Sequence, residues 1–256
     1  MLKYNTFSIT ARCGRTDELG VAVSTKVPAV GMLCPFVRSK VGAVATQSWV
    51  NPYLGIWGLE YLASGHTAQE TLEYLKTRDS GIEGRQLGIV DSSGGSAAFT
   101  GMECDTWNGD LTGPNYAIAG NMLVGPETLD AMRADFEGEE SRPLIERLLS
   151  ALAAGQAAGG DKRGRQSAAV KVYSTEVYPA LELRVDEHPD PVAELRRVYE
   201  VARTDLLPLI KMLPTLNRPE GNFDRDRQRE LGLLQDQADQ SPQQRQQPVT
   251  RPQDRR

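Results

Sequence analysis

The order of strand-like and helix-like segments is the feature that most constrains the fold of this 256-residue chain. Two short helices are expected between Leu54 and Leu75, the second with a capping box of Thr67 and Glu70, and a helical pattern runs from Pro126 to about Gly155. Strands in separate blocks, with helices between the blocks, indicate an α+β fold with antiparallel sheets and helices outside them. Strand-like runs, alternating or continuously apolar, occur over residues 6–12, 19–26, 40–48, 85–101, 116–125, 167–174 and 180–187. The first two runs together, and the run over 85–101 by itself, are expected to form hairpins.

Hydroxyl side chains alternate with apolar side chains in the first of these runs, NTFSITA. Thr6, Ser8 and Thr10 share one face of the expected strand, and Phe7 and Ile9 share the other. Threonine favours strands in any case, so a polar strand face is sufficient to explain the pattern. The alternative is that one of these hydroxyl groups carries chemistry.

Composition and charge exclude several classes of protein. With 39% hydrophobic residues, the chain can bury one substantial core. A net charge of -5 and a pI near 5.3 do not favour binding to nucleic acid or to an anionic membrane. No apolar run reaches the roughly 18 residues of a membrane span, and the first residues lack the layout of a secretion signal. A cytoplasmic location is therefore expected.

The cysteines and histidines argue against metal and disulfide sites. Cys13, Cys34 and Cys104 show no paired spacing, which is typical of small buried residues. His66 and His188 have no neighbour at ligand spacing, so neither a metal centre nor another cofactor is expected. If the chain is a hydrolase, its general base is not expected to be histidine.

The chain changes character past Asp186. An amphipathic helix is predicted from about residue 188, with Val192 and Leu195 on its apolar side and an end near Pro208 or Pro214. The remainder is rich in Gln, Arg, Asp and Pro and cannot bury enough apolar surface to order itself. The predicted division is a main domain over residues 1–187, a helical extension over 188–221 and a disordered polar tail over 222–256.

Five motifs, in order along the chain, resemble an uncharacterised bacterial family of domain-of-unknown-function proteins assigned to the Ntn-hydrolase-like fold. The motifs are TFSITAR, ELGVAVSTKVPAVG, VGAVATQSWVNPYLG, GNMLVG and GQAAGGDKRGRQSAA. The resemblance extends from about Thr6 to Asp190. It implies a four-layer αββα sandwich for the main domain, in agreement with the strand and helix blocks.

The resemblance also implies a chemistry for Thr6. In N-terminal nucleophile hydrolases, a Thr, Ser or Cys that begins the first strand attacks the substrate, and its own free α-amine is the base. An α-amine has a reference pKa near 7.7 to 8.0, so it can act at neutral pH without a histidine. In this chain Thr6 follows five other residues, so the Asn5–Thr6 bond must be cleaved to free that amine.

Further site residues are expected from the same resemblance. Lys26 is predicted to lower the pKa of the nucleophile, and Asp161 to orient its amine; a strand-end lysine is the plain alternative for Lys26. A phosphate loop at Gly155–Gly160 is disfavoured, because Asp161 stands where that motif requires lysine. The residues predicted to bind substrate are Thr46, Gln47, Ser48, Asn121, Arg165 and Ser167.

Two classes of function follow. The first is a hydrolase of an amide bond in a small-molecule or peptide-like substrate, with Thr6 as nucleophile. The second is a non-catalytic ligand-binding module that retains the sandwich. Homodimers or higher homo-oligomers are expected by analogy with other flat-sided sandwiches.

Overall fold

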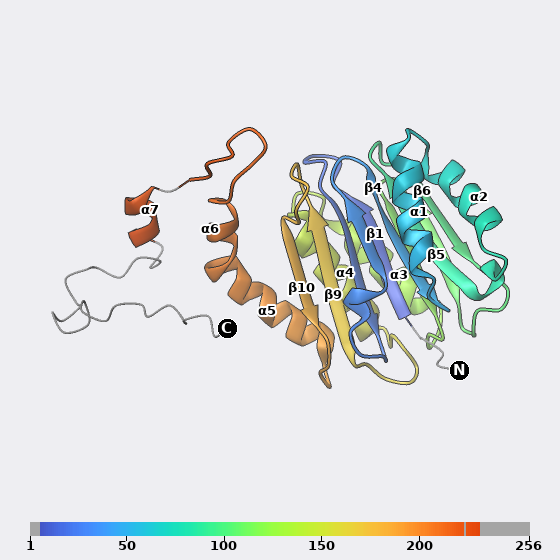
Figure 1. The fold of residues 1–256 in the computed structure, drawn as a ribbon. Helices are drawn as coiled ribbons and strands as arrows, with labels where there is room; N and C mark the ends of the chain where they lie inside the picture. Colours follow the sequence, from blue (N-terminus) through green and yellow to red (C-terminus); the bar gives the residue numbers. More distant parts are fainter. Residues whose placement is uncertain (1–5, 223, 231–256) are drawn as a thin grey trace, which may run out of the picture. The chain divides into compact units, whose positions relative to one another are not determined.

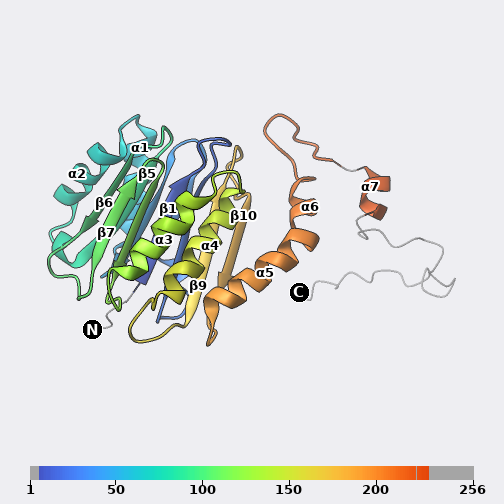
Figure 2. The ribbon, with the colours of Figure 1, turned by 180° about the vertical axis from the view of Figure 1, so that it is seen from behind.

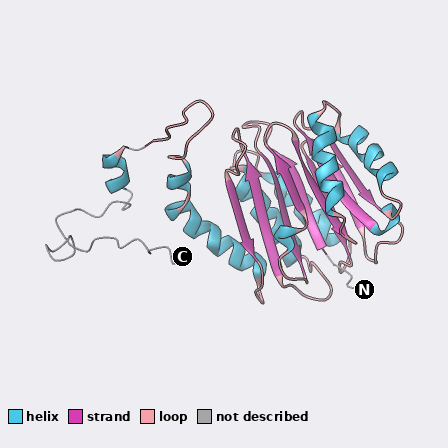
Figure 3. Cartoon of the chain, viewed as in Figure 1, coloured by secondary structure: helices cyan, strands magenta, loops and turns pink. Residues whose placement is uncertain are grey.

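The computed structural model describes residues 6–222 and 224–230. These residues belong to two compact units: the first extends to Thr204, and the second begins at Asp205. The first unit contains all ten strands of the described chain, arranged in two antiparallel sheets (Figures 1 and 3).

The larger sheet has six strands in the order β10-β9-β2-β1-β8-β7. The first strand pairs with its hairpin partner β2 on one side and with β8 on the other, so it lies inside the sheet. The strands are β1 (Thr6–Arg12), β2 (Leu19–Thr25), β7 (Gly109–Gly113), β8 (Tyr116–Asn121), β9 (Ser167–Tyr173) and β10 (Leu181–Val185).

The smaller sheet has four strands in the order β3-β4-β5-β6. It contains the predicted hairpin over residues 85–101 and the predicted strand that ends at Ser48. The strands are β3 (Pro35–Arg38), β4 (Gly42–Ser48), β5 (Arg85–Asp91) and β6 (Ser96–Thr100). Two short 3-10 turns, η1 (Val30–Met32) and η2 (Ile82–Gly84), precede β3 and β5.

Helices cover the outer faces of both sheets (Figures 1 and 2). On the four-stranded sheet lie α1 (Pro52–Ala63) and α2 (Ala68–Arg78), and α2 begins with the predicted capping box of Thr67 and Glu70. On the six-stranded sheet lie α3 (Glu127–Gly138) and α4 (Leu144–Ala157). The layers are therefore helix, sheet, sheet and helix, and the predicted α+β class is confirmed.

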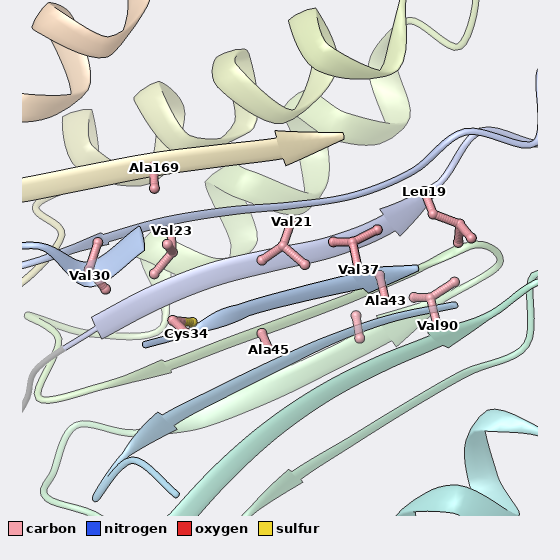
Figure 4. Packing of buried hydrophobic residues seen from close by; sticks show 11 residues of the cluster. Leu19, Val21, Val23, Val30, Cys34, Val37, Ala43, Ala45, Val90 and Ala169 are labelled. Carbon is pink, nitrogen blue, oxygen red and sulfur yellow. The ribbon is translucent and has the colours of Figure 1, made fainter. Parts of the chain in front are cut away.

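An apolar core fills the space between the two sheets (Figure 4). Val21 and Val23 of β2 face Ala43 and Ala45 of β4 across this space, together with Val37 of β3. Small and branched side chains alternate here, which allows the sheets to approach closely. A separate apolar cluster lies between the four-stranded sheet and its two helices.

The hydroxyl stripe of β1 faces this inter-sheet space rather than solvent. Thr6, Ser8 and Thr10 are each at most 2% exposed, and the Thr10 hydroxyl donates to the Gly88 carbonyl oxygen of β5 at 3.4 Å. The other face of β1 packs against the helical layer, where Phe7 lies close to Gly155. Both faces of the strand are thus covered, one by a sheet and one by helices.

Two predicted helices differ from the structure in length. The pattern from Pro126 to about Gly155 is two helices, because Pro143 cannot donate a backbone hydrogen bond and disfavours a helical residue before it. The helix predicted to end near Pro208 or Pro214 is α5 (Pro191–Asp205), which ends before Pro208. Its buried side chains include Val192 and Leu195, as the pattern predicts.

The second unit contains two short helices, α6 (Leu207–Ile210) and α7 (Arg225–Glu230). Most of the predicted polar tail, residues 223 and 231–256, lies outside the described residues. None of the helices in the described part of the chain is both long and apolar enough to cross a lipid bilayer.

Candidate functional site

Thr6 begins β1 and points into the space between the sheets. Its register partners are Thr25 on β2 and Asn121 on β8, so three polar side chains lie side by side at this end of the sheet. The Thr6 Oγ1 atom lies 3.2 Å from the Oγ1 of Thr25, within hydrogen-bond distance. Hydroxyl groups in such a pair hold one another in a defined rotamer.

Side-chain amides from the opposite sheet surround this pair. The Gln47 amide donates from Nε2 to Gln86 Oε1 at 2.7 Å and to the Thr6 carbonyl oxygen at 3.5 Å. Asn121 also donates to Gln86 Oε1, at 2.9 Å. Gln86 Nε2 in turn lies within hydrogen-bond distance of Thr100 Oγ1 and of two backbone carbonyl oxygens. The amides therefore form one connected network that joins the two sheets.

A small cavity of about 10 Å³ adjoins Thr6. Its polar lining comes from Thr6, Thr25 and Gln47, and Cys34 and the loop after β2 complete the wall. Burial raises the pKa of the Cys34 thiol to about 12, so this group is a neutral thiol at physiological pH. A cavity of this size has room for about one water molecule.

Asp161 ties three segments together close to this end of the sheet. Its buried carboxylate accepts hydrogen bonds from the backbone N–H of Lys26 at 3.1 Å and from that of Arg163 at 2.8 Å. The Arg163 guanidinium adds an ion pair at 3.2 Å, and Asp161 also forms a β-bridge with Leu123. The carboxylate therefore fixes the end of β2 against the loop that precedes β9.

Ser167 does not line the cavity but holds a loop that does. The Ser167 hydroxyl donates to the carbonyl oxygen of Val27 at 2.5 Å and accepts from the backbone N–H of Val30 at 3.2 Å. These bonds fix the loop after β2, which lines the cavity. Arg165 instead makes an exposed ion pair with Asp190 at 3.1 Å.

Three further predicted residues also have side chains that are not gathered around Thr6. Lys26 follows Thr25, so its side chain emerges from the other face of the strand, where Nζ donates to the Arg165 carbonyl oxygen at 3.4 Å. Thr46 precedes Gln47 on β4 and faces the helical layer, where its hydroxyl donates to the Asn51 carbonyl oxygen at 3.4 Å. Ser48 ends β4 with a positive φ, and its side chain forms a hydrogen bond with Cys104. The structure thus gathers Thr6, Gln47 and Asn121 at one point.

Comparison with known protein families shows which family the chain belongs to. A model of a family of unknown function, DUF1028, matches residues 6–195. The chain belongs to the DUF1028 family. This confirms the family resemblance that the five sequence motifs indicate. None of the curated proteins matches the chain.

Solved structures include a second member of the family. The crystal structure of a DUF1028 protein from Silicibacter pomeroyi is similar to the chain, with 31% sequence identity and a TM-score of 0.79. The match covers 86% of this chain and 96% of that protein. The ancestral beta-subunit Anbu from Yersinia bercovieri is 13% identical with a TM-score of 0.36, over 82% of this chain and 99% of Anbu.

Two residues of the candidate site are not among those expected from sequence. Thr25 is the register partner of Thr6, and Gln86 accepts hydrogen bonds from both Gln47 and Asn121. The hairpin register, which pairs Arg12 with Leu19, would have located Thr25. Gln86 carries no comparable local signal, because it reaches the site only through the packing of the second sheet.

Both histidines lie apart from this cluster. His66 stacks on Tyr61 with ring centroids 3.8 Å apart, and His188 Nδ1 accepts from the backbone N–H of Asp190 at 3.0 Å. Within residues 6–222 and 224–230, His, Cys, Asp and Glu side chains form no group of three or more that could hold a metal ion.

Proposed function

We propose that this chain is an N-terminal nucleophile hydrolase that cleaves an amide bond in a small or peptide-like substrate. The fold proposed for it is the Ntn-hydrolase-like sandwich, and Thr6 Oγ1 is its nucleophile. One observation carries the proposal: the Thr6 hydroxyl, at the start of an interior strand, lines a cavity between the sheets and lies 3.2 Å from Thr25 Oγ1. The layer order of helix, sheet, sheet and helix supports the proposed fold.

The general base in this proposal is the α-amine of Thr6. His66 and His188 have partners elsewhere, and the Cys34 thiol is neutral, so neither a histidine nor a thiolate is placed to activate the hydroxyl. A free α-amine with a pKa near 7.7 to 8.0 can accept a proton at neutral pH. The amine becomes free when the Asn5–Thr6 peptide bond is hydrolysed.

The reaction then proceeds in two steps. The amine takes the proton from Thr6 Oγ1 as that oxygen bonds to the substrate carbonyl carbon, and it gives the proton to the leaving nitrogen as the C–N bond breaks. The product of this step is an ester on Thr6. A water molecule, deprotonated by the same amine, hydrolyses the ester and regenerates the hydroxyl.

The neighbouring residues take supporting roles in this scheme. Thr25 orients the nucleophilic hydroxyl, and Gln47 and Asn121 present amide groups to the substrate. Asp161 and Lys26 are proposed as positioning residues, because the Asp161 carboxylate fixes the Lys26 backbone next to Thr25. Thr46, Ser48, Arg165 and Ser167 are proposed to act through the walls of the site rather than by contact with substrate.

A non-catalytic binding module is the second candidate, because the size of the cavity argues against turnover at Thr6. About 10 Å³ accommodates a water molecule but not a substrate amide. In this alternative, the polar groups around Thr6 serve to join the sheets, and the Asn5–Thr6 bond stays intact. The two candidates therefore differ in the covalent structure of the mature chain.

Intact-mass spectrometry of the purified, folded protein separates these candidates. The hydrolase proposal predicts cleavage of the Asn5–Thr6 bond, so the mass of the mature chain is expected to be that of a chain beginning at Thr6. Incubation with a β-lactone, an electrophile that acylates hydroxyl nucleophiles by ring opening, is expected to add the mass of the intact reagent to the Thr6 peptide. This adduct is expected to be absent from the Thr6→Ala variant.

Thr10→Ala is the matched control, because Thr10 is a buried threonine on the same face of the same strand. This variant is expected to be labelled like the wild-type chain. A folded protein that retains residues 1–5 and is not acylated at Thr6 would overturn the hydrolase proposal and leave the binding module.

A further inference from the structure

A second and larger cavity lies at the opposite end of β1 from Thr6. It has a volume of about 370 Å³, within the range of small-molecule sites. A strand of seven residues separates the two ends by roughly 20 Å, so this cavity is independent of the Thr6 site. Its walls come from the β1–β2 turn, the β7–β8 turn, the end of α3 and the face of α4, and include Arg12, Arg15, Asn115, Phe136, Glu140 and Arg147.

The lining of this cavity is rich in positive charge. Arg12, Arg15 and Arg147 contribute three guanidinium groups, whereas Glu140 is the one carboxylate among the described residues of the wall. Arg12 also pairs with Asp17 on the β1–β2 turn. Arg12 therefore has its own counter-ion, and the two positive charges of Arg15 and Arg147 face the one negative charge of Glu140.

Arg147 is buried with part of its hydrogen-bonding capacity unused. The residue is 8% exposed, its Nη2 donates to the Phe136 carbonyl oxygen at 2.7 Å, and its guanidinium carbon lies 4.0 Å from the centroid of the Phe136 ring. The Nε–H has no hydrogen-bond partner within the described chain. Burial lowers the pKa of the Arg147 guanidinium, because its charged form loses hydration without full compensation.

Arg12 has a buried Nε–H in the same condition. Its Nη1 donates to Asn115 Oδ1 at 2.9 Å and its Nη2 to Asp17, but Nε lacks a partner among the described residues. Two arginines from different elements thus line one cavity, and each also has a buried Nε–H without a partner among the described residues. Buried donors of charged groups are costly to leave unpaired, so the two guanidinium groups keep part of their positive charge uncompensated.

Cys13 lies in the wall of the same cavity. Burial raises the pKa of its thiol, but hydrogen bonds from Thr16 and Arg15 and, to a smaller extent, the charge of Arg15 outweigh it, so the pKa lies below its ordinary value.

We propose that this cavity binds the oxyanion group of a small molecule, a carboxylate or a phosphoryl group, between Arg12, Arg15 and Arg147. Guanidinium groups match both kinds of oxyanion, because their N–H donors are planar and fixed in direction. Arg12 and Arg147 supply two guanidinium charges from the wall of the cavity. Arg15 is exposed at the rim, and its charge attracts the anion from solvent.

Isothermal titration calorimetry of the full chain tests this proposal with inorganic phosphate and succinate as probes, at constant ionic strength in sodium chloride. Saturable binding at one site per chain is expected for at least one probe. Phosphate binding alone identifies a phosphoryl group, and succinate binding identifies a carboxylate. If neither phosphate nor succinate binds, the proposal is overturned.

Variants locate the site. Arg15→Gln is expected to weaken binding by at least about tenfold, and Glu140→Gln to strengthen it, because the two substitutions change the charge of the wall in opposite directions. Arg78→Gln makes the same charge change as Arg15→Gln, but on α2 in the opposite helical layer, and is the matched control. It is expected to leave the affinity unchanged.

Arg147→Met removes a buried donor directly, and circular dichroism shows whether this variant folds. If Arg147→Met does not fold, the test rests on Arg15→Gln, because Arg15 is exposed and its substitution is not expected to disturb the fold. Equal affinities for Arg15→Gln and Arg78→Gln would overturn the proposed site, because the anion would then bind by net charge alone.

Discussion

At the scale of single residues, buried polar side chains decide how the two sheets meet. Gln86 is fully buried, and its Nε2 faces Thr100 Oγ1 and the carbonyl oxygens of Gly109 and Gly120 at 2.8 to 3.1 Å. Its Oε1 accepts from Gln47 and Asn121. Only a group that donates on one side and accepts on the other fits these neighbours.

Gln86→Glu replaces that donor with a carboxylate of the same shape. The carboxylate faces two carbonyl oxygens in a buried site, so we expect the free energy of unfolding at pH 7 to fall by at least about 2 kcal/mol. Urea denaturation followed by circular dichroism measures the change. Gln69→Glu, on the exposed face of α2, is the matched control and is expected to change stability by less than about 0.5 kcal/mol. Equal stability of the two variants would refute this account of Gln86.

The hydroxyl stripe of β1 illustrates how much of the site can be predicted from residues alone. Alternation correctly places Thr6, Ser8 and Thr10 on one face, because side chains in any strand alternate. It does not say what covers that face. In a four-layer arrangement both faces of an interior strand are buried, so polarity no longer distinguishes solvent from core.

At the scale of elements, one carboxylate joins four segments at the end of the smaller sheet where β5 begins. Asp79 ends α2 and accepts hydrogen bonds from Asn51, which caps α1, from Arg85, which begins β5, and from the Gly81 backbone. Burial opposes ionisation of Asp79, but these hydrogen bonds outweigh it and hold the pKa of the carboxyl below its ordinary value.

Stability linked to Asp79 is expected to depend on pH. A carboxyl whose pKa is lower in the folded state stabilises the protein above its unfolded pKa of about 4, and this contribution is lost as the pH falls toward the lower folded value. Asp79→Asn is therefore expected to cost about 1–2 kcal/mol at pH 7 and less at pH 3. Urea denaturation at both pH values measures the difference.

Glu73→Gln on the same helix is the control for the Asp79 prediction. Glu73 makes an exposed ion pair with Lys76, which contributes little to stability. A cost for Asp79→Asn that stays constant from pH 7 to pH 3 would contradict the lowered pKa of Asp79.

Elements with strong local patterns could be predicted, and those set by contacts could not. The capping box of Thr67 and Glu70 and the β1–β2 hairpin follow from neighbouring residues, and both are present. The strands β3 and β7 are not among the predicted segments. Each has only four or five residues, and pairing with β4 and β8 defines them.

At the scale of the whole molecule, the block order of the sequence was sufficient to predict the class of fold. Strands that follow one another as hairpins pair within one sheet, and the helices between blocks have only the outer faces to cover. The strand order of the six-stranded sheet was not predictable in the same way. It brings β8 beside β1 and β9 beside β2 across long separations in sequence, and this is what gathers Thr6, Thr25 and Asn121.

The position of α5 raises the question of where the main domain ends. The predicted boundary at residue 187 leaves this helix outside the domain. In the structure α5 lies beside the β10 edge of the larger sheet in both views (Figures 1 and 2), with Val192, Leu195 and Tyr199 buried. The Tyr199 hydroxyl also lies 3.1 Å from Glu146 of α4, and burial together with this bond raises the pKa of Tyr199 to about 12.

Two truncated chains test whether α5 is part of the folding unit. A chain that ends at Asp205 keeps the buried side chains of α5, so its thermal midpoint is expected to lie within about 2 °C of the full chain. A chain that ends at Glu187 loses several buried apolar side chains, at about 1.5–3 kcal/mol each, and its midpoint is expected to fall by at least roughly 10 °C. Tyr199→Phe in the full chain, which keeps the ring and removes the hydroxyl, is expected to lower the midpoint by only a few degrees. Equal midpoints for the two truncated chains would place the boundary at residue 187, because α5 would then contribute nothing to the cooperative unfolding of the sandwich.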